Sequence, residues 1–466
     1  MFDLIDGQER PDNKKYTYEQ FENGEIVLAK GDYKKVMNVI HNIFGIMIAV
    51  DTKEIFIYDN RKGYYKEISP DQLTGIYEKL TGEHMSTSTS DVFKKKIFRW
   101  FGEDYCLRKH SIIEKFVESS KRYVCFKNGL FDLELENFFP HRKTVYFRNA
   151  IDANYTTDKN CPIFSQYMKD FTTGREEVER TLLEFFSYCF VSGYHFGHNF
   201  LVLTGTGRNG KSTLIRLIAN VLGQSATSNV PIDKLEGFEL DFIAGKLLNY
   251  SGESSNNWTD GESLANLKAI TGGDSISIKA KFKRSYQESN LPKMIFAMNH
   301  LPKFGETTLA LRKRLICIEG LMSLDGREDS SIEDRLYSER DAIVSMLMDH
   351  LITVKNNRKV FVYENNNKVL NNIEKDSSIY SRFFYDRIKA ERDSELWQDE
   401  LWSEFKKYCE SEDYKFDTSK TVFAKKLSQL LEPHQIRKKR NNGKVRTIYF
   451  HIGFHPTEDT SDEYVD

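Results

Sequence analysis

The sequence predicts an α/β protein that is built around a parallel sheet. Residues 200–204 form a continuous apolar run, which is typical of a strand that is buried on both faces. A glycine-rich turn and an amphipathic helix follow this strand. Further apolar strands are expected at 247–250, 293–298 and 314–318. Buried strands that alternate with helices indicate a sheet covered by helices on both faces.

The residues on the N-terminal side of this core predict two further regions. Residues 54–58 and 63–68 are expected to form a hairpin around the turn 59–62. Residues 112–194 have a more helical pattern, with apolar side chains on one helix face between 182 and 190. We therefore expect an α+β region that is followed by a helical one.

The residues after the core predict a linker and a small C-terminal domain. Residues 356–372 are rich in Asn and Lys and are expected to hold a loop or linker. Helices are expected at 396–409 and 422–431. Residues 437–452 then read as two strands that are joined by the Asn-Gly turn at 442–443.

The composition excludes several classes of protein. The chain has 466 residues, a net charge of −2 and 29% charged residues. Its longest apolar run, residues 43–50, is too short to cross a bilayer, and the first residues show no secretory signal pattern. We therefore expect a cytoplasmic protein, neither exported nor bound to a membrane.

No metal or disulfide framework is expected. The six cysteines lie far apart and form no CxxC pair, so they predict reduced thiols. His195 and His198 have no third ligand nearby and are expected to pack or cap. Asp132, Glu134 and Glu136 alternate, which fits the polar side of a strand better than a metal site.

The strongest motif is a phosphate-binding loop at residues 205–212, with the pattern GxxxxGK[ST]. It lies between a buried strand and a helix, the context that supports this motif. In such a loop, backbone N–H groups surround phosphates, the lysine reaches the β- and γ-phosphates, and the hydroxyl coordinates Mg²⁺. The sequence therefore predicts a site for a nucleoside triphosphate and Mg²⁺ that is formed by Gly205, Thr206, Gly207, Arg208, Asn209, Gly210, Lys211, Ser212 and Thr213.

Polar residues at the ends of three other predicted strands complete a candidate catalytic set. One strand leads to Glu253, which is expected to hold Mg²⁺ or polarise water, although Gly252 replaces the usual second acid. Another leads to Asn299, whose amide can orient an attacking water. Arg312 and Arg314 begin a further strand and can stabilise the charge of phosphoryl transfer. Each residue alone also fits a surface acid, a turn amide or a basic turn.

Two basic segments are candidates for binding DNA. In the first, residues 279–284, which are expected to form a hairpin, basic residues alternate with an aromatic ring. The positive charges suit the phosphates of a single DNA strand, and the ring suits a nucleobase. The second, residues 417–450, has nine Lys or Arg and two acids. Its helix and hairpin resemble a winged-helix module, which would bind duplex DNA. A solvated, charged surface is the alternative for both. The candidates are Lys279, Lys281, Phe282, Lys283, Arg437, Lys438, Lys439, Arg440, Lys444 and Arg446.

Taken in order, these motifs resemble those of the superfamily 3 helicases, and especially the phage/plasmid and poxvirus-type primase-helicase family. The loop at 205–212 resembles the family pattern GxGxNGKS. Residues 267–276, 296–302 and 311–315 resemble the middle motif, the third motif and the arginine-containing strand start. The segments that resemble the region before the ATPase are 126–132, 153–155 and 161–164. The chain resembles replication initiators of phage-inducible chromosomal islands and related mobile elements.

The resemblance implies an AAA+-type ATPase core that assembles as a hexameric ring. Such a ring uses ATP and Mg²⁺ to move along one DNA strand, typically from 3′ to 5′, and acts in the cytoplasm of a bacterial host cell. Its partners would be single- and double-stranded DNA at a replication origin and host replication proteins. The first residues are too few for a primase domain, so a separate primase is expected.

The resemblance also implies roles for the candidate residues. The nucleotide would lie between subunits, with Lys211, Ser212 and Glu253 on one side together with Asn299. Arg312, with Arg314, would reach in from the next subunit. The hairpin with Lys279 and Lys283 would project into the pore. The expected divisions are an N-terminal α+β region (1–104), a helical domain (105–195), the ATPase domain (196–325), a helical segment and linker (326–385), a winged-helix-like domain (386–455) and an acidic tail (456–466).

Two other functions compete with the helicase. An initiator or loader would use ATP only to assemble on DNA and would not need a hairpin with Lys279 and Lys283. A packaging motor or a small-molecule phosphotransferase would share the loop at 205–212, and the phosphotransferase would be indifferent to DNA. The basic C-terminal segment and the middle motif argue against this last pair.

Overall fold

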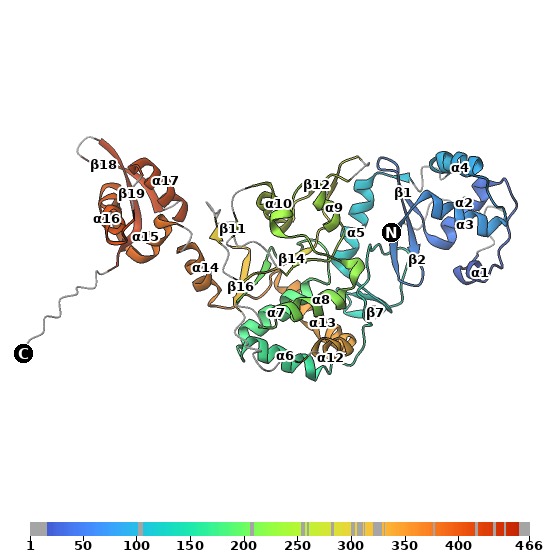
Figure 1. Cartoon of the computed structure of the whole chain (residues 1–466), viewed down its shortest axis with the longest axis horizontal. Helices are drawn as coiled ribbons and strands as arrows, with labels where there is room; N and C mark the ends of the chain where they lie inside the picture. Colours follow the sequence, from blue (N-terminus) through green and yellow to red (C-terminus); the bar gives the residue numbers. More distant parts are fainter. Residues whose placement is uncertain are drawn as a thin grey trace, which may run out of the picture.

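The protein is described from a computed structural model, in which the chain runs from an N-terminal region through a central sheet to a C-terminal region (Figure 1). The described residues are 16–100, 106–205, 209–252, 257–258, 261–280, 284–299, 303–304, 311, 313–319, 329, 331–375, 378–414, 418–431, 435–441 and 444–455.

The N-terminal region is a four-stranded sheet with helices packed against it. The strand order is β3-β2-β1-β4, in which β1 and β4 are parallel and the other pairs antiparallel. Ser69 caps α3 in a capping box, and Pro70 provides the fixed φ of its first turn. The predicted hairpin is confirmed by β2 and β3. The elements are α1 (Tyr18–Glu22), α2 (Tyr33–Phe44), β1 (Met47–Ala49), β2 (Glu54–Asp59), β3 (Tyr64–Ile68), α3 (Pro70–Thr81), α4 (Thr87–Trp100) and β4 (Cys106–Leu107).

The next region differs from the prediction, because it contains a three-stranded antiparallel sheet, β5-β6-β7, as well as helices. The prediction that Glu134 and Glu136 lie on a strand is also wrong. The carboxylate of Asp132 accepts hydrogen bonds from the N–H groups of Glu134 (2.9 Å) and Leu135 (3.2 Å), which closes a turn. The elements are α5 (Lys109–Arg122), β5 (Tyr123–Phe126), β6 (Gly129–Asp132), β7 (Asn137–Phe139), α6 (Pro162–Thr172) and α7 (Glu176–Tyr188).

The central sheet has five parallel strands in the order β16-β8-β14-β10-β9. This confirms the predicted α/β fold with a parallel sheet. The continuous apolar run of β8 is explained by burial on both faces, since Leu201 and Leu203 join one core cluster and Phe200 and Val202 join the other. The elements are β8 (Phe200–Thr204), α8 (Lys211–Leu222), β9 (Thr227–Ser228), β10 (Leu248–Ser251), α10 (Glu262–Gly272), β14 (Lys293–Ala297), β16 (Leu315–Glu319), α12 (Ile332–Ser338) and α13 (Arg340–Asn357).

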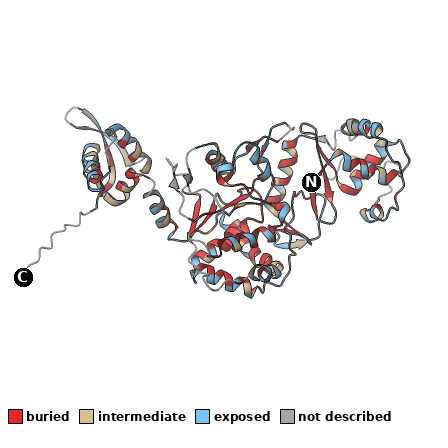
Figure 2. Ribbon diagram, in the orientation of Figure 1, coloured by how far each residue is buried: buried red, intermediate tan, exposed pale blue. Residues whose placement is uncertain are grey.

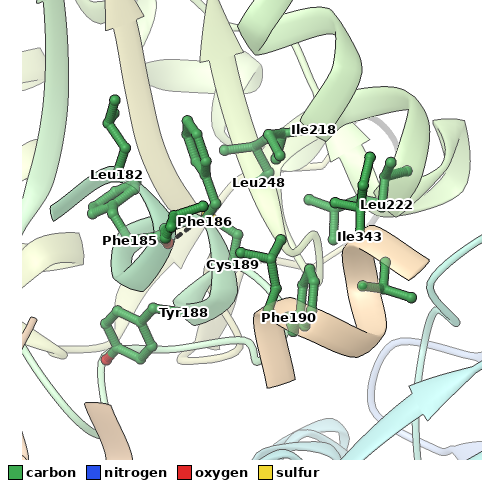
Figure 3. Close-up of a cluster of buried hydrophobic side chains, with 14 of the residues drawn as sticks. Leu182, Phe185, Phe186, Tyr188, Cys189, Phe190, Ile218, Leu222, Leu248 and Ile343 are labelled. Atoms are coloured by element: carbon green, nitrogen blue, oxygen red, sulfur yellow. Dashed lines mark hydrogen bonds between the residues drawn. The ribbon is translucent and has the colours of Figure 1, made fainter. Parts of the chain in front are cut away.

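The larger core lies between this sheet and the helices α7, α8 and α13 (Figure 2). Phe186 and Phe190, from α7 and the residues after it, lie with Ile218 and Leu222 of α8 and with Leu248 of β10 (Figure 3). These side chains fix α8, and therefore the loop before it, against the strands.

Two short strand pairs and several short helices extend from the central sheet. The strands β12 and β13 are antiparallel and are the two strands of the predicted hairpin. The strands β11 and β15 are parallel and follow β10 and β14 along the chain. The elements are η1 (Gln224–Ala226), η2 (Ile232–Lys234), η3 (Gly237–Glu239), α9 (Leu240–Ile243), β11 (Asn257–Trp258), β12 (Ile276–Ile278), β13 (Tyr286–Glu288) and β15 (Lys303–Phe304).

Asparagine side chains bond backbone groups of the edge strand β16 and of the chain just beyond β9. At the edge strand β16, the side chain of Asn366 donates to the Leu315 carbonyl (3.1 Å) and accepts from the Cys317 N–H (3.0 Å). At the other edge, β9 has only two residues. There the side chain of Asn249 bonds both the N–H and the carbonyl of Val230, each at 2.9 Å.

The C-terminal region combines helices with a three-stranded sheet of order β17-β19-β18. The hairpin of β18 and β19 confirms the two predicted strands, whereas β17 was not predicted. The predicted linker at 356–372 is wrong in its second half, which belongs to α14. The elements are α14 (Asn366–Lys375), α15 (Ile379–Arg387), β17 (Ile388–Trp397), α16 (Gln398–Ser411), α17 (Lys420–Leu430), β18 (Ile436–Asn441) and β19 (Lys444–Phe454).

Candidate active site and DNA-binding surfaces

The carboxyl ends of three neighbouring strands lie together at one end of the central sheet. Strand β14 lies between β8 and β10, with Ala297 opposite Leu203 of β8. Gly205 and Gly252 directly follow β8 and β10, and Asn299 lies two residues after β14, so the three residues lie at the same end of the sheet. In open parallel sheets this end is where ligands bind. Glu253 follows Gly252 and lies outside the described residues.

Lys211, the first residue of α8, is held inside the glycine-rich loop. Its Nζ donates to the Gly205 carbonyl (2.7 Å) and to Asn209 Oδ1 (2.7 Å), and its side chain is largely buried. Burial lowers the pKa of Lys211 below its usual value. Gly210 has φ 76°, a left-handed conformation that favours glycine and lets the chain turn into the helix.

The start of α8 fits a phosphate group. Its N-cap is Gly210, which has no side chain, so no cap occupies the N–H groups of the first turn. Ser212 is exposed beside these N–H groups, and the Thr213 hydroxyl donates to Glu333 (3.4 Å). The N–H groups therefore suit an anion, and the Ser212 hydroxyl beside them suits a bound Mg²⁺. Thr206, Gly207 and Arg208 lie outside the described residues.

One residue that contacts this loop, Tyr167, is not among the candidates predicted from the sequence. Tyr167 of α6 is buried, and its hydroxyl donates to the Gly210 carbonyl (2.9 Å). Burial raises the pKa of Tyr167, so the hydroxyl stays a donor at neutral pH. In the sequence, Tyr167 resembles any aromatic residue on the buried face of a helix. Only the fold reveals its contact with the loop.

Asn299 and the arginines differ in their surroundings. Asn299 is exposed two residues after β14. The guanidinium of Arg314 donates to the Lys268 carbonyl and to the Thr271 hydroxyl (3.2 Å) at the end of α10. Arg314 is therefore tied to its own chain. Arg312 lies outside the described residues.

A buried lysine lies at the opposite end of β14 from Asn299. Lys293 Nζ donates to the carbonyls of Val191 (2.7 Å) and Gly193 and lies 3.9 Å from the ring centroid of Tyr188. Burial lowers the pKa of Lys293 to about 7. The residue holds β14 against the segment that follows α7.

The first DNA-binding candidate is the turn between β12 and β13. Lys279 directly follows β12 and is exposed. Lys281, Phe282 and Lys283 lie outside the described residues. The described part of the hairpin therefore presents one of the four predicted contacts to solvent.

The second candidate is the β18–β19 hairpin. Four consecutive basic residues of β18 are exposed: Arg437, Lys438, Lys439 and Arg440. Lys439 is paired with Glu395 (2.7 Å) and Arg446 with Asp399 (3.0 Å), while the Arg437 guanidinium lies 4.5 Å from the ring centroid of Phe450. Lys444 begins β19, and its side chain is not among those described. The hairpin therefore carries a continuous basic strand.

Three families match successive parts of the chain. "D5 N terminal like" matches residues 41–173, "Family of unknown function (DUF5906)" matches residues 203–314, and "Poxvirus D5 protein-like" matches residues 380–457. The two D5 matches lie on either side of the central sheet, in the order that the resemblance predicted. These matches make the chain similar to the phage/poxvirus-type D5 primase-helicase family over both of its flanking regions.

The fold of this D5-like protein is also similar to solved structures. Two apo structures of the NrS-1 C-terminal region align with a TM-score of 0.51 at 10% and 11% identity, and each alignment covers 90% of this chain and 98% of the other. At such low identity the likeness shows the fold alone.

Neither a metal cluster nor a membrane span is found in the described part of this D5-like chain. Within that part, no group of three or more His, Cys, Asp or Glu side chains could hold a metal ion. Across the same residues, no helix is both long enough and apolar enough to cross a membrane.

Proposed function

We propose that this protein is an ATP-dependent DNA helicase that acts in the replication of a mobile genetic element. The observation that carries the proposal is the strand order of the central sheet. Because β14 lies between β8 and β10, the phosphate-binding loop, Asn299 and the chain that leads to Glu253 lie together where the carboxyl ends of these strands meet. The similarity to D5 proteins supports the same activity.

In this proposal the loop from Gly205 to Thr213 binds the phosphates of ATP. Lys211 contacts the β- and γ-phosphates after exchanging its bonds to Gly205 and Asn209 for phosphate oxygens. Ser212 and Glu253 hold Mg²⁺, which neutralises charge on the phosphates when bound. Asn299 orients the attacking water. Tyr167 fixes the Gly210 carbonyl and so keeps the loop in register.

We further propose a hexameric ring in which each nucleotide lies between two subunits. Arg312 then reaches the nucleotide of the neighbouring subunit. Arg314, which the sequence analysis placed beside it, holds the end of α10 instead, because its guanidinium is bonded within its own chain. The hairpin with Lys279 and Lys283 contacts one DNA strand in the pore, with movement from 3′ to 5′.

We propose that residues 386–455 are a winged-helix-like domain that grips duplex DNA, and that the other predicted domain boundaries hold as well. The order of strand β17, helices α16 and α17 and strands β18 and β19 supports this. Thr421, Val422 and Lys425 are exposed on α17, which would enter a groove, and the basic β18–β19 hairpin would contact phosphates. Host replication proteins and a separate primase would complete replication in the bacterial cytoplasm.

The test is ATP-dependent unwinding of a forked duplex, with Lys211→Ala as the inactive variant. Without the ammonium that contacts the phosphates, hydrolysis and unwinding should fall by roughly 100-fold or more. Lys234→Ala, at an exposed lysine on η2, is the matched control and should behave as the wild type. DNA-stimulated hydrolysis without strand separation would favour a loader. Hydrolysis that does not respond to DNA would contradict both functions.

A further inference from the structure

Four charged side chains from four separate segments meet at one place between the N-terminal region and the β12–β13 hairpin, and three of them are buried while the fourth, Arg148, is mostly covered. Lys109 Nζ pairs with Glu54 of β2 at 2.6 Å, and both side chains are almost completely buried. Arg148 pairs with Glu288 of β13 at 2.8 Å, and the Glu288 side chain has no exposed surface. The four charges balance, two positive and two negative.

The two pairs form one cluster rather than two independent contacts. Tyr286, which lies two residues before Glu288 on β13, has its ring centroid 4.8 Å from Lys109 Nζ. Burial and the nearby Arg148 lower the pKa of Lys109, whereas Glu54 and Glu288 act in the opposite direction. Each charge of the cluster therefore affects the others through a shared, water-poor space.

The backbones around the cluster are also held in place. The second oxygen of Glu288 accepts from the Asn290 N–H at 2.9 Å, which fixes the end of β13. Asp51, before β2, accepts from the Lys109 N–H at 2.9 Å. Gly245 has φ 71°, and a Cβ there would lie 2.3 Å from the Arg148 guanidinium carbon. Glycine is therefore required at 245 for Arg148 to reach Glu288.

The cluster lies at the base of the hairpin that we propose contacts DNA. In the register of β12 and β13, Glu288 is opposite Ile276 and Tyr286 is opposite Ile278. Lys279 directly follows Ile278. A displacement of Glu288 by an ångström would therefore move Lys279 by a similar amount. Buried ion pairs add little net stability but define geometry, because every alternative arrangement leaves a buried charge unpaired.

We infer that the N-terminal region sets the position of the β12–β13 hairpin through this cluster. Arg148 and Glu288 are then positioning residues for the contact between the hairpin and a DNA strand, and residues 16–100 and 106–107 form the fixed support of the hairpin. This role rests on the proposed function of the hairpin. The cluster gives the N-terminal region a part in transmitting ATP hydrolysis to DNA, although it lies on the far side of the ATPase from the C-terminal region (Figure 1).

The experiment uses the full chain with both charges of one pair removed, Arg148→Met with Glu288→Met. Removing both avoids the lone buried charge that could unfold a single variant. We expect ATP hydrolysis without DNA at the wild-type rate. Stimulation by single-stranded DNA and the rate of unwinding should fall roughly 10- to 100-fold, the effect of displacing a contact by about 1 Å. A double variant that is stimulated and unwinds like the wild type would overturn the inference.

A matched control removes another ion pair that is remote from the hairpin and joins a half-exposed arginine to a buried acid. Arg180 and Glu184 of α7 pair at 2.8 Å, and Glu184 is as buried as Glu288. Arg180→Met with Glu184→Gln should leave the response to DNA unchanged. If the control loses the response to the same extent, the loss in the Arg148 and Glu288 variant reflects general destabilisation, and the inference fails.

A distance measurement tests the cluster independently of any activity. Spin labels at Val27→Cys in the N-terminal region and Ser277→Cys on β12 occupy exposed positions. We expect one narrow distance distribution in the wild type and in the Arg180 and Glu184 control, and a broad one in the Arg148 and Glu288 variant. An unchanged distribution would overturn the inference. A wild type with the narrow distribution but no response to DNA would instead contradict the proposed function.

Discussion

The hairpins β12–β13 and β18–β19 both carry basic residues, but they are attached to the protein in different ways. The strands of the first have three residues each, and its base is buried with Glu288 in a cluster of four charges. The strands of the second have six and eleven residues, and its basic side chains are exposed along β18. Their acidic partners, Glu395 and Asp399, are themselves partly exposed.

The difference indicates different tasks. A hairpin whose base is fixed by buried charges transmits movement, because it cannot shift without the domains that hold it. Exposed ion pairs contribute little and are easily exchanged for phosphates. The β18–β19 hairpin therefore suits an adaptable grip on duplex DNA, whereas the β12–β13 hairpin suits a rigid arm.

The largest expected effect contrasts a buried lysine with an exposed one. Lys109→Met leaves Glu54 buried without its ammonium partner and should destabilise the protein by about 3–5 kcal/mol. Lys439→Met removes the exposed pair with Glu395 and should change stability by about 0–1 kcal/mol. Hydrogen exchange of amides in β2 and β19 reports both effects in the same chain. Equal losses would remove the distinction between the two hairpins.

The next expected effect separates the tasks of the hairpins. Lys279→Ala with Lys283→Ala removes two charge-assisted contacts worth about 1.5 kcal/mol each, so unwinding should slow roughly 100-fold while duplex binding is retained. Lys438→Ala with Arg440→Ala is the matched variant of the other hairpin. It should lower the slope of log affinity for duplex against log salt by about 2. The two variants are compared by unwinding rates and by duplex titrations over a range of salt.

Two outcomes would contradict the tasks assigned to the two hairpins. Normal unwinding by the Lys279 and Lys283 variant would show that the pore assignment is wrong. An unchanged salt slope in the Lys438 and Arg440 variant would return the C-terminal hairpin to a solvated surface.

The smallest expected effect concerns another buried lysine, Lys293. The pKa of Lys293 is lowered from 10.5 to about 7 by burial. Between these values the unfolded chain binds more protons at this site than the folded protein, so folding becomes more favourable as pH rises. The contribution is at most about 1.4 kcal/mol per pH unit.

The measurement is the melting temperature of the wild type and of Lys293→Met at several pH values from neutral to alkaline. Relative to the variant, the wild type should gain stability as the pH rises above 7. Parallel profiles would show that Lys293 keeps an ordinary pKa. The exposed lysine variant Lys234→Met controls for general effects of charge.

The central sheet could be predicted from the sequence because burial on both faces leaves a continuous apolar run. The strand β17 could not, since its residues are mostly partly or fully exposed and it contains an irregular register with Asp393 at φ 62°. The helix α14 was predicted as a linker because Asn and Lys dominate it. Its single buried amide, Asn366, and the buried Leu370 are enough to dock it.

The part of the candidate site whose residues are close in the sequence could be predicted. The part that depends on packing between distant segments could not. The loop around Lys211 follows a spacing that the sequence displays. The contact of Tyr167 with Gly210 joins residues 43 positions apart. Arg148 and Glu288 are 140 positions apart. No periodicity or motif indicates such pairs, because they arise only when separate segments pack together.

The asparagine side chain at the edge strand β16 has a consequence for assembly. Asn366 occupies the groups of β16 to which a strand from another molecule would bond, and Asn249 bonds the chain just beyond β9. Edge strands with free polar groups invite the addition of further strands. At β16 the sheet therefore cannot grow into a ribbon shared between molecules. A neighbouring copy would meet this edge through loops and helices, contacts that can slide and re-form without breaking a ladder of hydrogen bonds.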